Sequence, residues 1–394
     1  MNFSSKLKNN NALLVVFDQL LNSTITASVP FVIINYLGED LMVEFVFVQS
    51  LMIYYVSIIE SLLISPYYYL ILKDKIKFSE TIFTLSFILS IISICVILVV
   101  EIFYNLPLFI FLFYVTNVLK RFSINKNISE MNTKENIKNS LIYFSFYWLN
   151  ILLMSLEMVS INVFIVLTLL NLIYLFNEIK LLKLNQKLNY SFIMQSFNIG
   201  KWSLYNMVIQ LIITQIILFK LNNFSNKKAI IVYGLAITLT GVLNPIISSF
   251  NNYIISYVKS KLNYSKIKFR KLIYKINFIY IAILISLSLF VVMIFPIIEE
   301  IFIKEKFEGL YLVFLFILLS LIFKSDNQFN SRVITLIYSR KIVFITGLIS
   351  LFFIIFIFPI NSFKWESWLV TSFLLSRISA SLYSKYILIK RLNV

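Results

Sequence analysis

The sequence predicts an all-helical integral membrane protein with about twelve transmembrane helices. Of its 394 residues, 60% are hydrophobic and only 13% are charged, and the mean hydropathy is +0.88. A soluble domain carries about 25% charged residues. Long apolar runs follow one another along the whole chain, and basic residues concentrate in every second connection between them. These three observations place most side chains in lipid.

The apolar runs meet or approach the length of about 20 residues that a membrane-spanning helix needs. They cover approximately 12–36, 41–65, 81–101, 106–119, 139–156, 159–176, 202–219, 229–256, 272–297, 309–323, 342–360 and 367–388.

The basic residues give the orientation. With the N-terminus inside, 28 of the 35 Lys and Arg fall in inner segments and 6 in outer loops, while Arg377 lies within a span. Cytoplasmic loops carry the excess of Lys and Arg. We therefore expect both termini in the cytoplasm, and basic inner loops that touch anionic membrane lipids rather than nucleic acid.

The widest inner connections are 120–138, 177–201, 257–271 and 324–341. The second of them divides the spans into two sets of six. The prediction is an N-terminal six-helix bundle at 1–176, a cytoplasmic linker at 177–201 and a C-terminal six-helix bundle at 202–394. Because each set has an even number of spans, the two bundles enter the membrane in the same orientation and form a parallel repeat.

A polar stripe marks the first span of each half. A shift of 188 residues superimposes two triplets with i, i+4, i+8 spacing, so that each triplet lies along one face of its helix. The triplets are Asp18, Asn22 and Thr26 in the first half and Asn206, Gln210 and Thr214 in the second. We expect both stripes to line a central cavity and to contact substrate, apart from Asp18, for which a different role is expected.

Asp18 and Glu60 are carboxylates within the first two spans. Charges inside the membrane usually face a protein interior or an aqueous cavity. These spans form a hairpin that places the two carboxylates at similar depth, which suits coupling to H⁺ or Na⁺. The alternative is that both side chains extend to the inner headgroups.

Two cations are candidates for binding an anionic substrate. Arg377 lies near the middle of the last span and is expected to be the only deep cation; its guanidinium suits either a phosphate or a carboxylate that locks two helices. Lys201 lies at the cytoplasmic mouth of the seventh span, beside Trp202, where an interfacial anchor is the alternative.

Pro30 and Pro245 interrupt the first and eighth spans and are hinge candidates, because proline removes a backbone donor and kinks a helix. Histidine is absent, Cys95 is the only cysteine, and no phosphate-binding or hydrolase motif appears. We therefore expect no metal site, no cofactor and no enzymatic activity.

As a whole, the pattern resembles the Wzx group of polysaccharide flippases in the MOP (MATE-like) superfamily. The features that carry the resemblance are twelve spans in two parallel halves, short outer loops, basic inner loops and the polar, proline-containing first span with its counterpart from Gly200 onward. The resemblance implies alternating access in a bacterial inner membrane. The cargo would be an undecaprenyl-pyrophosphate-linked oligosaccharide, moved to the periplasmic leaflet for O-antigen or capsule biosynthesis.

The resemblance also implies ion coupling, and partners in the polymerase and chain-length regulator of the same pathway. Two alternatives remain at this point. One is an O-antigen polymerase, although its large periplasmic loop has no counterpart here. The other is a MATE-like drug or cation antiporter, which the carboxylates Asp18 and Glu60 leave open.

Overall fold

The computed structural model describes helical segments in both halves of the chain. The described residues are 3–36, 38–59, 61–62, 112, 116–117, 120, 123–124, 133–155, 163–176, 190–223, 227–244, 247, 258, 265–302, 307–359 and 364–393. Their main helices are α1 (Phe3–Tyr36), α2 (Glu39–Ile59), α6 (Thr133–Ser155), α7 (Val163–Phe176), α8 (Tyr190–Asn223), α9 (Lys227–Gly241), α11 (Lys266–Phe302), α12 (Leu310–Ile337), α13 (Lys341–Ile357) and α14 (Trp365–Asn393).

All regular structure within these ranges is helical, so the prediction of an all-α fold is confirmed. Three of the described helices are long and apolar enough to cross a membrane, and Lys341–Ile357 is a shorter apolar helix. The three are Gly200–Asn223, Ile267–Glu300 and Leu310–Ile337.

The chain divides into two compact units. The first unit comprises Met1–Ile25 and Leu51–Leu204, and the second comprises Thr26–Ser50 and Tyr205–Val394. The bundle boundaries expected from the sequence, 1–176 and 202–394, remain a prediction. Each unit is described below by itself.

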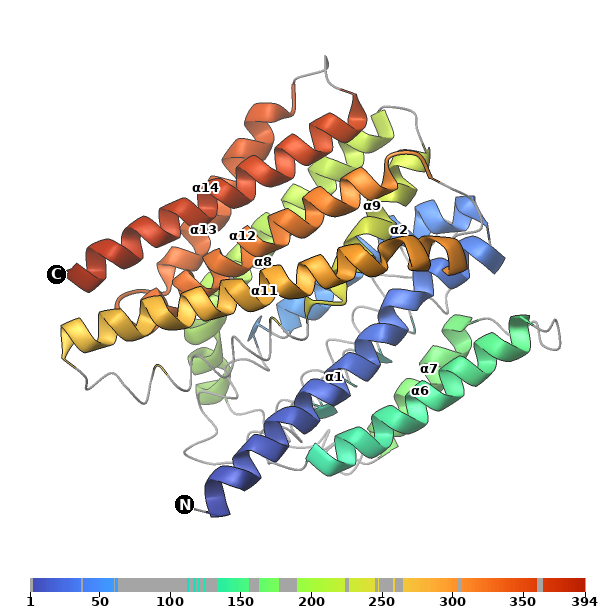
Figure 1. The fold of residues 1–394 in the computed structure, drawn as a ribbon, viewed down its shortest axis with the longest axis horizontal. Helices are drawn as coiled ribbons and strands as arrows, with labels where there is room; N and C mark the ends of the chain where they lie inside the picture. Colours follow the sequence, from blue (N-terminus) through green and yellow to red (C-terminus); the bar gives the residue numbers. More distant parts are fainter. Residues whose placement is uncertain are drawn as a thin grey trace. The chain divides into compact units, whose positions relative to one another are not determined.

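In the second unit, α12 packs against α9, α11, α13 and α14, and α13 also packs against α14. Figure 1 shows α11, α12 and α14 running side by side. Helix α9 is apolar on all sides, and every residue from Ala229 to Ala236 is buried. A helix without a polar face belongs in the centre of a packed bundle.

Helix α11 lies at the edge of this packing. Its buried residues, which include Ile273, Tyr280 and Leu284, follow one helical face, whereas Phe278 and Met293 on other faces are each 77% exposed. Exposed large apolar side chains of this kind are expected where a helix faces lipid. At about 55 Å for 37 residues, α11 exceeds the hydrocarbon thickness of about 30 Å.

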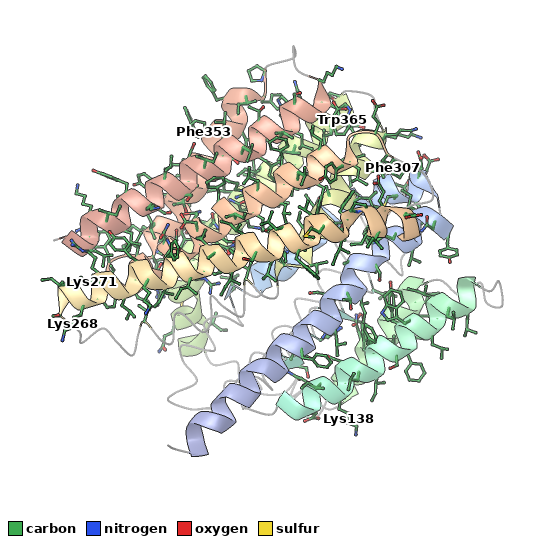
Figure 2. The ribbon with its side chains drawn as sticks, in the orientation of Figure 1. Lys138, Lys268, Lys271, Phe307, Phe353 and Trp365 are labelled. Atoms are coloured by element: carbon green, nitrogen blue, oxygen red, sulfur yellow. The ribbon has the colours of Figure 1, made fainter. Side chains whose placement is uncertain are left out.

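The two ends of the second unit differ in character. Figure 2 shows Lys268 and Lys271 at one end of α11, with Phe307 and Trp365 toward the opposite end of the helices. This distribution fits a cytoplasmic end that carries the basic residues and an outer end with an aromatic belt.

One predicted span was too short. The apolar pattern predicts a tenth span that ends at 323 and an inner connection at 324–341, but α12 continues to Ile337. Phe329, Val333 and Ile334 are at most 1% exposed, so this half of the helix is anchored by packing despite its polar residues. Helix α8 likewise begins at Tyr190, so the end of segment 177–201 is helical.

Candidate functional site

Asp18 forms the centre of a polar network in the first unit. Its side chain is only 1% exposed, and the Ser140 hydroxyl of α6 donates a hydrogen bond to its Oδ1. Asn22, one turn further along α1, donates from Nδ2 to Ser140 Oγ at 2.9 Å and to the Asp18 carbonyl at 2.9 Å. The carboxylate is therefore enclosed by protein, and the alternative that it extends to the headgroups is wrong.

A buried cation belongs to the same network. Lys120 is 5% exposed, and its Nζ lies 3.5 Å from the centroid of the Tyr143 ring, a cation–π contact. Its charge also attracts the Asp18 carboxylate. The charge pattern predicts Lys120 in an inner loop, but position 120 is helical and buried. The centre of the first unit thus combines one carboxylate with one ammonium.

The second unit has a cationic centre. Arg377, near the middle of α14, donates from Nη1 to Gln210 Oε1 on α8 at 3.0 Å. Lys324, near the middle of α12, is half-buried and close enough to Arg377 for the two positive charges to interact. The expectation that Arg377 is the only deep cation is therefore wrong. It failed because Lys324 was assigned to a loop.

Of the predicted polar stripe on α8, only Gln210 has a described contact with Arg377. Gln210 reaches the guanidinium, whereas the Thr214 hydroxyl donates to the Gln210 carbonyl of its own helix at 3.0 Å. Asn206 faces α13, where a Cβ added to Gly347 would overlap its Oδ1. Among the three residues, Gln210 is the one with a direct link to a charged group in the described contacts.

The remaining predicted site residues have mixed outcomes. Lys201 is part-exposed, with Asn198 Oδ1 at 3.5 Å and the Trp202 ring centroid at 6.0 Å from its Nζ. These local contacts fit an interfacial anchor. Pro30 is buried within α1, which continues as one helix through it. The side chain of Thr26, and the residues Glu60 and Pro245, lie outside the described part of the chain.

Sequence reasoning missed a buried acidic group, Asp326 on α12. It is 8% exposed and accepts hydrogen bonds from Asn277, Asn330 and Ser381. The signal that could have found it is the recurrence of apolar residues at helical spacing through Phe329 and Val333, which indicates that the helix continues. The charged residues Lys324, Asp326 and Arg332 masked that periodicity.

Helix α2 contacts α8 and α9 within the second unit, partly through residues predicted to lie in outer hairpins, Asp40 and Lys227. Lys227 Nζ lies 2.7 Å from Asp40 Oδ1, and Gln215 donates to Ser50 Oγ at 2.9 Å. Gly234 of α9 lies directly against the Val46 side chain of α2, with no room for a Cβ. The first half of α2 therefore touches α9 at Gly234.

Comparison with known proteins gives a consistent answer for the fold. No protein-family model matches the sequence, and no curated protein matches it. An inward-facing multidrug resistance MATE transporter of the MOP superfamily superimposes with a TM-score of 0.68 at 12% identity, covering 97% of this chain and 99% of that one.

Two further structures extend the comparison. The inward closed lipid II flippase MurJ has a TM-score of 0.63 at 16% identity, with 99% of this chain and 88% of that one covered. A MOP superfamily transporter from Pyrococcus furiosus has a TM-score of 0.60 at 10% identity, with coverage of 98% and 96%. The chain therefore has the fold of the MOP superfamily transporters, as the sequence predicted.

Proposed function

We propose that this chain is a multi-pass transporter of the bacterial inner membrane that flips an anionic, lipid-linked oligosaccharide. The cargo is an undecaprenyl-pyrophosphate-linked repeat unit, which moves from the cytoplasmic to the periplasmic leaflet by alternating access. The product would feed the polymerase and chain-length regulator of O-antigen or capsule biosynthesis.

The observation that carries the proposal is the pair of cations at the middle of α12 and α14. The positive charges of Lys324 and Arg377 are close enough to repel each other. Charged side chains inside a membrane are costly and are usually retained for function. A pyrophosphate would relieve their repulsion, and the planar guanidinium of Arg377 can bind two phosphate oxygens at once. Gln210 supports this role because it fixes one edge of the guanidinium at 3.0 Å.

The fold is compatible with this chemistry. One similar structure is described as a lipid II flippase, so the architecture accommodates a lipid-linked cargo in at least one protein. The polymerase alternative fits less well, because the connections from α1 to α2 and from α8 to α9 are only a few residues long. A large outer catalytic loop has no place in either of them.

A drug or cation antiporter is the second candidate. Several similar structures are described as MATE transporters, some of them multidrug resistance proteins. The buried Asp18 carboxylate favours such a role, since a carboxylate can exchange H⁺ against a cationic drug. However, Ser140 already donates a hydrogen bond to this carboxylate, and the charge of Lys120 compensates it. The cationic centre of the second unit would repel a cationic drug.

Deletion of the gene, with fractionation of the lipid-linked repeat units by leaflet, tests the proposal. The flippase predicts loss of surface polysaccharide and accumulation of lipid-linked units that remain accessible only from the cytoplasmic face. Unpolymerised units in the periplasmic leaflet would instead identify a polymerase. Unchanged polysaccharide together with increased sensitivity to cationic dyes would identify a drug exporter.

A further inference from the structure

An apolar groove lies between α8 and α13 of the second unit. It has a volume of about 320 Å³, and the described side chains that line it, Tyr205, Val208, Ile209 and Phe344, present only apolar atoms to it. The rings of Tyr205 and Phe344 meet in a T-shaped contact with their centroids 5.8 Å apart. Ligand pockets range from about 300 to 1,000 Å³. The groove therefore has room for part of a chain-like ligand.

The groove is open toward the surface of the unit. Tyr205 and Val208 are each 40% exposed, whereas Ile209 is 5% exposed and forms the floor. Helix α13 comes close to this floor at Gly347, where an added Cβ would stand 3.5 Å from Ile209 Cδ1. Lipid chains are as apolar as these walls. The groove is therefore filled either by an acyl chain of the bilayer or by the chain of a bound ligand.

The floor of the groove adjoins the cationic centre. Ile209 is followed directly by Gln210, whose Oε1 accepts the hydrogen bond from Arg377 Nη1 at 3.0 Å. Consecutive side chains of a helix project about 100° apart, so Ile209 faces the groove while Gln210 faces α14. A ligand with a charged group at Arg377 and an apolar chain attached to that group would therefore reach the groove directly.

The depth of the groove matches the start of the proposed transport path. Tyr205 is five residues beyond Gly200, where the apolar part of α8 begins, and Phe344 is three residues beyond the start of α13. At 1.5 Å per residue, Tyr205 lies about 8 Å and Gln210 about 15 Å from Gly200. In the predicted orientation, the groove is thus on the cytoplasmic side of the cationic centre. A cargo that starts in the cytoplasmic leaflet has its chain on this side.

Both the groove and its neighbour favour a prenyl pyrophosphate over a phospholipid. Each prenyl unit carries a double bond and a methyl branch, so the chain loses less conformational freedom on binding than a saturated chain does. The branches also offer atoms that pack against the ring of Phe344. At the adjacent centre, Lys324 and Arg377 supply two positive charges. Two cations attract a pyrophosphate more strongly than the single phosphate of a phospholipid.

We infer that the groove between α8 and α13 binds the first isoprenoid units of the cargo while the pyrophosphate is held at the cationic centre. The inference deepens the proposed function and rests on it for the identity of the cargo. It gives Val208, Ile209 and Phe344 a role in recognition, for which an apolar residue within a span carries no sequence signal of its own.

The test measures equilibrium binding to the purified full-length protein in nanodiscs. The three probes are geranylgeranyl pyrophosphate, the straight-chain hexadecyl pyrophosphate and inorganic pyrophosphate. Val208→Trp fills the groove and should weaken binding of the prenyl probe roughly tenfold, with the affinity for inorganic pyrophosphate unchanged. Ile283→Trp is the matched control, because Ile283 is 39% exposed on α11, away from the groove; it should bind all three probes as the unaltered protein does. Partitioning of the probes into the bilayer is the same for every variant, so differences between variants report the groove.

If Val208→Trp does not fold, Phe344→Leu decides the question, because it removes the aromatic wall without adding volume. It should weaken the prenyl probe roughly threefold and leave inorganic pyrophosphate unaffected. Unchanged prenyl affinity in the groove variants would overturn the inference. Equal affinities for the hexadecyl and prenyl probes would also overturn it, since the groove would then accept an ordinary acyl chain.

The same measurements separate this inference from the proposed function. Arg377→Ala should weaken binding of all three probes, inorganic pyrophosphate included, because it removes the phosphate ligand rather than the groove. Pyrophosphate binding that does not depend on Arg377 would count against the proposed function. A prenyl probe that is sensitive to Arg377→Ala but not to Val208→Trp would instead leave the proposed function standing and remove the groove.

Discussion

The two stripes that the predicted repeat relates belong to polar centres with different charges. In the first unit the stripe supplies a carboxylate, Asp18, which Ser140 and the ammonium of Lys120 balance. In the second unit the corresponding stripe is neutral, and its Gln210 accepts a hydrogen bond from Arg377 beside Lys324. The first centre pairs a carboxylate with an ammonium, whereas the second brings two cations near one glutamine side chain. The proposal of an anionic cargo therefore assigns its binding to the second centre.

The largest effect should come from separating the charges of the first unit. Asp18→Asn and Lys120→Met each leave one buried charge without its partner, which typically costs about 3–5 kcal/mol. The double variant should cost clearly less than the sum of the two, because it leaves no unpaired charge. The Tm of the three detergent-solubilised variants measures this coupling. Additive losses would show that the two groups do not compensate each other.

Removing the guanidinium of the second unit should act on transport more than on stability. Arg377→Ala should lower the surface polysaccharide output at least tenfold at equal protein level, because bidentate phosphate binding is lost. Arg377→Lys should restore part of the activity, since it keeps the charge but not the fork geometry. Gln210→Leu should fall between the two. Full output from an Arg377→Ala variant that inserts normally would remove Arg377 from the binding site.

The membrane class and the fold could be predicted because composition alone decides which solvent surrounds the side chains. Helix ends could not. At Lys324 and Asp326 the sequence rule assigns charged residues to a loop, yet Asp326 is satisfied by donors from α11 and α14 that lie 49 and 55 residues away in sequence. Such partners become visible only in three dimensions.

The sequence predicted several individual site residues but not the contacts between them. Arg377 and Gln210 were both candidates, but they are 167 residues apart in sequence, so their contact could not be derived from spacing. Ser140 and Lys120 were missed because each lies at or beyond the edge of an apolar run. They are nevertheless the residues that hydrogen-bond to and compensate the Asp18 carboxylate.

A smaller effect on stability is expected where Gly347 approaches Asn206, the first residue of the polar stripe on α8. In Gly347→Ala the new methyl group would overlap Asn206 Oδ1, and such overpacking typically costs about 1–3 kcal/mol. Gly241→Ala is the matched control, because its nearest atom, Asn244 Nδ2, would lie at an ordinary 3.6 Å. The Tm should fall for Gly347→Ala alone. Equal Tm values would mean that Asn206 moves aside without loss, and hence that it is not fixed.

The smallest effect should come from the exposed ion pair of the second unit. Asp40 and Lys227 are 83% and 69% exposed, and water screens such pairs strongly. The hydrogen bond and charge of Asp40 raise the pKa of Lys227 above its usual 10.5. The pair's contribution is thus present at neutral pH and is lost only as the pH rises through that raised value. Asp40→Asn should therefore lower the Tm slightly in low salt, equally at pH 7 and pH 9, and not at all in 1 M salt. A loss that persists in high salt would instead assign Asp40 a packing or gating role at the outer end of α2, where Val46 already contacts Gly234.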